Sequence, residues 1–240
     1  MKKEDIMVPA YSYSLVCNQL KYAFKQRYKV QPERFIRMVG LLFARPTSSI
    51  AMAEILPNLD YFHHRSGNNI DFFCGGYGMF WENWLDKFPD QIEVATGRGN
   101  WLFSAQKFNE FREEIESMSK WQYSGAVDLI LTNARFDLEK EIAVLDFSST
   151  IVCNIEKMKA VKAIESVEMF FEKIFRFAEQ FIGDDPTWGF SDKQGVAIAG
   201  SALKRIILSL LPKKLEEEAL RAAHFAITDA SLPAAKIHPI

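Results

Sequence analysis

The segment from Val39 to Gly78 constrains the fold of this chain more than any other part of it. An apolar run, Val39 to Phe43, is broken by the polar stretch Arg45-Pro46-Thr47-Ser48. A helix-length amphipathic segment ends at Gly67, and a second apolar run covers Ile70 to Cys74. Two short apolar runs joined by a helix-length crossover predict a βαβ unit with a parallel strand pair. The segment carries no chemical signature that names a function.

Similar patterns continue along the rest of the chain. Short apolar runs predict strands at Ile92 to Ala95, at Val127 to Thr132 and at Ile142 to Phe147, with Ile151 to Ile155 as an extension or a further strand. Amphipathic periodicity predicts helices over 11–29, 161–182, 196–211 and 212–227. A further helix is expected to begin after Ser104, a plausible N-cap, and Pro212 suits the first turn of the last helix. We therefore expect an α/β fold, with a central mixed or parallel sheet flanked by helices and with C-terminal helices.

Length and composition indicate the domain organisation. A chain of 240 residues with 48% hydrophobic residues can bury a core without disulfides. We expect one α/β domain over 1–182, with an aromatic-rich insertion at about 79–120. A connector and a C-terminal helical extension over 183–240 would pack on the same domain.

Three further features of the sequence narrow the functional classes: its charge, its cysteine spacing and the absence of long apolar runs. The formal net charge of −2 does not favour a nucleic-acid partner. Cys17, Cys74 and Cys153 are far apart and form no CxxC, which fits buried thiols in a reducing cytosol. No apolar run approaches the roughly 18 residues that span a bilayer. We expect a cytoplasmic protein with no membrane partner.

The order of the expected elements is similar to the thioredoxin-like layout: strand, helix, strand, two neighbouring strands, and a final helix. Pro57 resembles the helix-kinking proline of that family, and Tyr123-Ser124-Gly125 resembles the entry to its third strand. The resemblance covers about 36–182, with 79–120 as an insertion. A flavodoxin-like or other doubly wound sheet predicts much the same elements.

The chain departs from this family at the two positions that carry its chemistry. The stretch Pro46 to Met52, where the CxxC would stand, holds no cysteine, and Ala126-Val127 replaces the cis-proline. No thiol nucleophile or resolving partner can be transferred. We therefore expect no thiol–disulfide exchange through that motif.

Four residues are candidate catalytic groups. Cys74 ends a predicted strand. Its thiol would become a nucleophile only if a nearby histidine such as His64 lowered the thiol pKa. A buried, unreactive cysteine is the more common alternative. Asp71 and Asp146, together with Asp128, lie in or near predicted strands, where carboxylates can gather around Mg²⁺, although capping and turn roles are more common. No histidine spacing such as HxxxH predicts a metal site, and nothing specifies a cofactor.

Two glycine-rich turns are candidate ligand sites. Gly97, Arg98 and Gly99 could hold a phosphate through backbone amides and a guanidinium, although most such turns only reverse the chain. Gly75 and Gly76 follow a predicted strand and would let a ligand approach the backbone.

Four aromatic residues in the expected insertion, Phe80, Trp81, Trp84 and Phe88, form either a partner-binding anchor or a roof over the core. We expect a non-catalytic interaction or accessory subunit of a cytoplasmic assembly, with a protein partner or a second copy of the chain. The alternative is an enzyme or effector that acts on a nucleotide or another phosphorylated small molecule.

Overall fold

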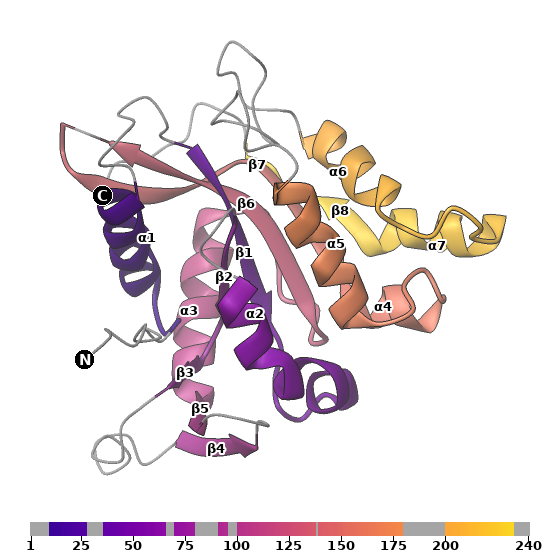
Figure 1. The fold of residues 1–240 in the computed structure, drawn as a ribbon, viewed down its shortest axis with the longest axis horizontal. Helices are drawn as coiled ribbons and strands as arrows, with labels where there is room; N and C mark the ends of the chain where they lie inside the picture. The colour runs from indigo at the N-terminus through magenta and orange to yellow at the C-terminus, as the bar shows by residue number, and fades with distance from the viewer. Residues whose placement is uncertain are drawn as a thin grey trace.

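A five-stranded mixed sheet organises the structure, a computed structural model that describes residues 10–27, 36–65, 70–79, 91–95, 100–137, 139–179 and 200–232 (Figure 1). Its strand order is β2-β1-β6-β7-β8. The β1–β2 pair is parallel and the other neighbouring pairs are antiparallel. This confirms the expected α/β class. The strands are β1 (Ile36–Phe43), β2 (Ile70–Cys74), β6 (Asp128–Asp137), β7 (Ile142–Asn154) and β8 (Ile227–Asp229).

The predicted βαβ unit is confirmed. Strands β1 and β2 pair in parallel, with Leu42 opposite Cys74. The crossover changes helix type along its length, from the π-helix η1 (Ala51–Ile55) to the 3-10 turn η2 (Leu56–Asn58) and the α-helix α2 (Leu59–Arg65). Pro57 lies in the 3-10 turn, where a residue without an N–H disturbs the hydrogen-bond pattern least.

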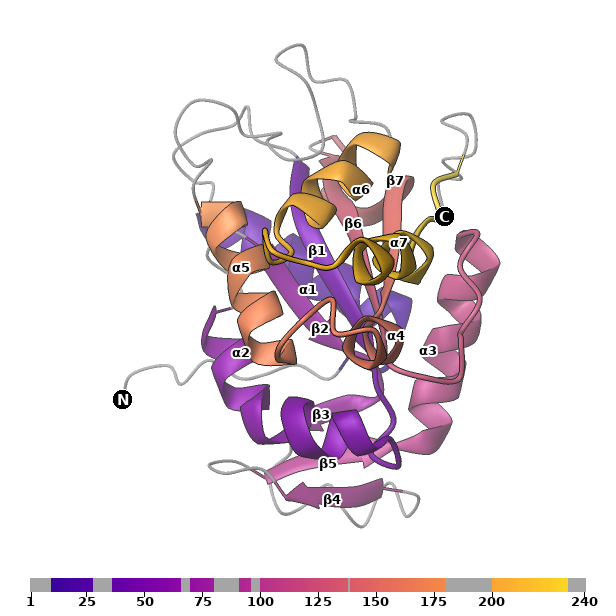
Figure 2. The ribbon, with the colours of Figure 1, turned by 90° about the vertical axis from the view of Figure 1, so that its right-hand side faces the viewer.

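Helices cover both faces of the main sheet (Figure 2). On one face lie α1 (Tyr13–Arg27) and α3 (Ala105–Met118), where the Phe43 ring of β1 contacts the Phe111 ring of α3 at a centroid distance of 5.4 Å. On the other lie α2, α5 (Val167–Glu179) and α6 (Gly200–Ser209), where Phe72 of β2 contacts Phe171 of α5 at 5.1 Å. Aromatic packing thus joins the sheet to the helices on both sides.

Ser104 begins α3 as its sequence predicts. The Ser104 Oγ accepts a hydrogen bond from the Lys107 backbone N–H at 3.1 Å, which satisfies one otherwise unpaired donor of the first turn. The buried residues Phe108, Phe111 and Ile115 form the apolar face that packs toward the sheet.

A second, three-stranded sheet lies below the main one in Figure 1, with the order β3-β5-β4. Its strands are β3 (Tyr77–Met79), β4 (Gln91–Ala95) and β5 (Asn100–Ser104), all paired antiparallel. Only Gly75 and Gly76 separate β2 from β3, so this pair of glycines joins the two sheets.

The helix expected over 161–182 begins later than predicted. A short helix, α4 (Ile155–Ala160), ends in a turn where Lys162 has a φ of 56°, and α5 starts only at Val167. The Val167 backbone N–H donates to Glu54 Oε2 at 2.7 Å, and Ser166 Oγ accepts from the Met169 N–H at 3.1 Å. These two acceptors satisfy first-turn donors of α5, which is why it starts there.

The open question at Ile151 is resolved by the structure, since β7 runs without interruption to Asn154. Its pairing with β6 is irregular between Leu131 and Asn133, where extra residues of β7 form a bulge.

The C-terminal part differs in detail from the expectation. Helix α7 (Glu217–Ala226) begins after Pro212, which lies in the link from α6 rather than in a first helical turn. Strand β8 follows α7 and pairs with β7, a strand too short to predict from its three residues. Within the described residues, no helix has the length and apolar character needed to cross a membrane.

Candidate functional site

Cys74 and His64 lie in different settings. Burial raises the pKa of the Cys74 thiol well above its ordinary value, and no cationic group is among the causes of this shift. His64 is exposed on α2. A nucleophilic cysteine needs a lowered pKa, so this environment favours the neutral thiol. Burial likewise raises the pKa of Cys153 to about 12 and that of Cys17 to about 11.

Asp71 and Asp146 lie far apart in the sheet. Asp71 is in β2 and Asp146 in β7, three strand positions away, or about 14 Å at the usual strand spacing. Asp146 is buried, forms an ion pair with Arg135, and accepts a hydrogen bond from the Ser148 backbone N–H at 2.9 Å. The described part of the chain contains no cluster of three or more His, Cys, Asp or Glu side chains suited to a metal ion.

Gly75 and Gly76 allow the chain itself to pack closely. The Gly75 N–H donates to Leu42 O at 2.8 Å, and the Gly76 N–H donates to Ala10 O at 2.9 Å. A Cβ on Gly76 would lie 2.7 Å from the Phe108 Cβ. Both backbone donors are therefore used within the fold, and the space that a ligand would need is filled by the core.

The other two groups of candidates fall outside the described residues. They are the turn residues Gly97, Arg98 and Gly99 and the aromatic residues Phe80, Trp81, Trp84 and Phe88.

The structure instead brings polar side chains together at the carboxyl end of β1. We call this group the Tyr123 cluster: Arg45, Arg112, Tyr123, Asp128 and Glu156. All four charged members act electrostatically on the Tyr123 hydroxyl, whose pKa is raised mainly by burial. They come from the loop after β1, from α3, from the start of β6 and from α4. The carboxyl ends of strands are where open α/β sheets bind ligands.

The carboxylates of the Tyr123 cluster are held by other groups of the protein. Asp128 accepts hydrogen bonds from Trp121 Nε1 at 3.1 Å and from the Ser124 backbone N–H and Oγ at 2.9 and 2.7 Å. Burial, the largest effect, raises its pKa, and these hydrogen bonds lower it. Glu156 accepts from Ser48 Oγ at 2.7 Å.

The two guanidinium groups of the cluster each keep a buried donor without an acceptor. Arg45 donates from Nη2 to Asn109 Oδ1 at 2.7 Å, and its Cζ lies 4.9 Å from the centre of the Phe108 ring. Arg112 donates from Nη2 to Glu113 at 2.8 Å. The Nε atoms of both arginines are buried and have no hydrogen-bond partner among the described residues.

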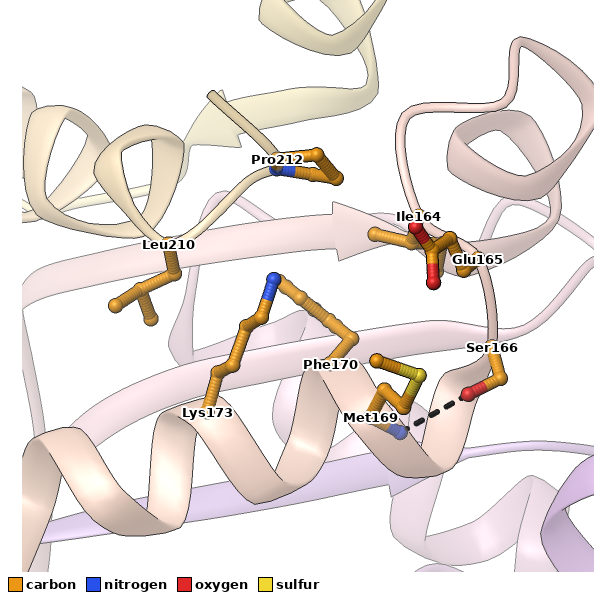
Figure 3. Close-up of a pocket in the computed structure, with 8 residues that line it drawn as sticks. All are labelled: Ile164, Glu165, Ser166, Met169, Phe170, Lys173, Leu210 and Pro212. Atoms are coloured by element: carbon orange, nitrogen blue, oxygen red, sulfur yellow. Dashed lines mark hydrogen bonds between the residues drawn. The ribbon is translucent and has the colours of Figure 1, made fainter. Parts of the chain in front are cut away.

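A pocket of about 90 Å³ lies between the start of α5 and the link from α6 to α7 (Figure 3). Five apolar side chains line it: Ile164, Met169, Phe170, Leu210 and Pro212. The Lys173 side chain extends from α5 toward this link, and Glu165 lies at the opposite side. No described residue forms an ion pair or hydrogen bond with the Lys173 ammonium.

Sequence reasoning missed both of these sites. Arg45 closely follows the first predicted strand, and Tyr123 stands shortly before the strand predicted at Val127 to Thr132, so their positions next to strand ends were available as a signal. The pocket had no comparable signal, because its lining comes from segments more than thirty residues apart in sequence.

No protein-family model, curated protein or solved structure shows significant similarity to this chain.

Proposed function

We propose that the chain is a non-catalytic interaction or accessory subunit of a cytoplasmic assembly, and that the pocket beside α5 receives a partner protein. The observation that carries this proposal is the apolar lining of that pocket. A concave apolar pocket with a charged rim is the usual form of an interface anchor point.

The occupant that fits is one apolar side chain of a partner segment. The pocket, of about 90 Å³, has room for an apolar side chain. The Lys173 ammonium at the rim would pair with a carboxylate on the same segment, and such complementary charge favours orientation and encounter. Met169 is 50% exposed, so its side chain would contribute to the contact.

The scaffold is part of this proposal. The parallel β1–β2 pair and the order of elements along the chain support a thioredoxin-like layout. The position of the expected CxxC is occupied by the start of the crossover, Pro46 to Met52, without a thiol. We propose that such a layout is used here for binding.

The test compares two exposed methionines. The wild-type chain, Met169→Glu and Met52→Glu are used as baits in pull-downs from the native source and are measured by light scattering. Met52 is 54% exposed and lies in η1, outside the pocket, so it is a matched control. We expect Met169→Glu to lose the partner, or the self-association, that wild type and Met52→Glu retain.

Two results would contradict the proposal. One is a wild-type chain that is monomeric and retains no protein. The other is a Met169→Glu chain that retains the same partner as wild type to the same extent.

A further inference from the structure

The Lys173 ammonium at the pocket beside α5 differs from other half-buried lysines in its lack of an acceptor. Lys107 and Lys159 form ion pairs with glutamates at 2.7 and 2.8 Å, and Lys204 donates to a backbone carbonyl. Lys173 is equally half-buried, and no described residue accepts from it. A half-buried ammonium has lost part of its hydration, so an acceptor from another molecule stabilises it. The pocket therefore has a position for a negative group of its occupant.

This ammonium belongs to the wall of the apolar pocket itself. Met169 and Phe170 stand four and three residues before Lys173 on α5, and residues at these spacings are neighbours on one helix face. From there the Lys173 side chain extends toward the link from α6 to α7, where Leu210 and Pro212 form the other wall (Figure 3). One occupant can therefore fill the apolar lining and reach the ammonium at the same time.

Two more ammonium groups extend the positive charge along this link. Lys213 and Lys214 follow Pro212 directly, are exposed, and form no ion pair or hydrogen bond within the described residues. Among the residues that line the pocket, the carboxylate is that of Glu165, at the opposite side. Acidic residues begin again at Glu216, where α7 starts. The charge around the pocket is therefore uneven, with its positive part confined to the link and the facing side of α5.

We infer that the partner segment is acidic, with an apolar residue in the pocket and two or more carboxylates on the side of Lys173, Lys213 and Lys214. This inference rests on the proposed function and adds the chemical class of the partner to it. An uncharged apolar segment would cover Lys173 and leave its ammonium without an acceptor, which is costly, whereas an acidic segment pairs with it. The chain as a whole has a formal net charge of −2, so the attraction is local to the pocket.

The test selects peptides from a random heptapeptide library that is acetylated and amidated at its ends, so that side chains supply every charge. The baits are the whole wild-type chain, Lys173→Met and Lys120→Glu, in roughly 0.1 M and 1 M sodium chloride. Methionine keeps an apolar stem at position 173 and removes the charge. Lys120 is exposed just after α3 and does not line the pocket, so it is the control for a lost surface charge.

We expect wild type and Lys120→Glu to enrich peptides that combine a large apolar residue with two or more Asp or Glu residues. The enrichment should fall roughly fivefold or more in Lys173→Met, because an ion pair is lost. It should also fall in 1 M salt, which screens the lysines of the link.

Four results would overturn the inference. Enrichment of uncharged apolar peptides by wild type would do so and would leave the proposed function in place. Acidic peptides enriched equally by wild type and Lys173→Met would show that they bind elsewhere. A library with no enriched peptide would also contradict it, while the pull-downs with Met169→Glu and Met52→Glu decide the proposed function separately. Self-association of wild type that Lys173→Met abolishes in light scattering would place a second copy of the chain in the pocket instead.

Discussion

At the scale of single residues, the environment of Asp128 predicts how stability depends on pH. Burial raises the pKa of this carboxyl in the folded state. Its contribution to the free energy of unfolding is therefore complete below the unfolded pKa of about 4 and decreases as the pH rises through the folded value. We expect the stability of wild type relative to Asp128→Asn, measured by urea unfolding, to fall as the pH rises above about 4. Because asparagine keeps an acceptor for Trp121 and Ser124, a relative stability that instead grows with pH would contradict this environment.

At the scale of elements, the turn from β2 to β3 depends on Gly76. Its φ is +80°, and a Cβ there would approach the Phe108 Cβ to 2.7 Å. Gly125 has a similar φ of +81°, but no atom lies within 4 Å of the position that a Cβ would take there. Gly125 is therefore a matched control. We expect Gly125→Ala to cost about 1–2 kcal/mol for the backbone alone, and Gly76→Ala to cost roughly 1–3 kcal/mol more from overpacking. Chemical denaturation measures both, and equal losses would show that Phe108 does not restrict the turn.

At the scale of the whole molecule, the C-terminal helices and the sheet should unfold together. Ile207 of α6 and Leu41 of β1 are both fully buried, and β8 adds to the same sheet as β1. We expect Ile207→Ala and Leu41→Ala each to lower stability by roughly 2–5 kcal/mol and to shift one common transition in calorimetry. A second transition, shifted only by Ile207→Ala, would instead show that the C-terminal part folds as a separate unit.

The patterns that predicted elements correctly are local ones. The apolar runs of β1 and β2 and the Ser104 cap of α3 depend on neighbours a few residues away. The start of α5 was placed too early because the apolar pattern continues through 161–166, whereas the contact that starts the helix is made with Glu54, more than a hundred residues earlier. The cap at Ser166 was the one local signal that would have corrected it.

The candidate sites were predictable to a lesser degree. Periodicity placed Cys74, Gly75 and Gly76 at the end of a strand. Only the packing shows that the thiol is kept neutral and that the Phe43 and Phe108 side chains occupy the space beside the two glycines. The Tyr123 cluster joins Arg45 to Asn109 across 64 positions of sequence, and no local pattern contains such a pair.

By itself, the amino-acid sequence determined the α/β class, the parallel β1–β2 unit and the absence of a CxxC at the start of its crossover, because hydrophobic period and residue identity are local properties. Tertiary structure alone decided that β8 joins β7, that a pocket opens beside α5, and that two arginines present unpaired donors near Tyr123. Each of these depends on segments brought together from distant parts of the chain, where burial and the supply of hydrogen-bond partners are set by the fold as a whole.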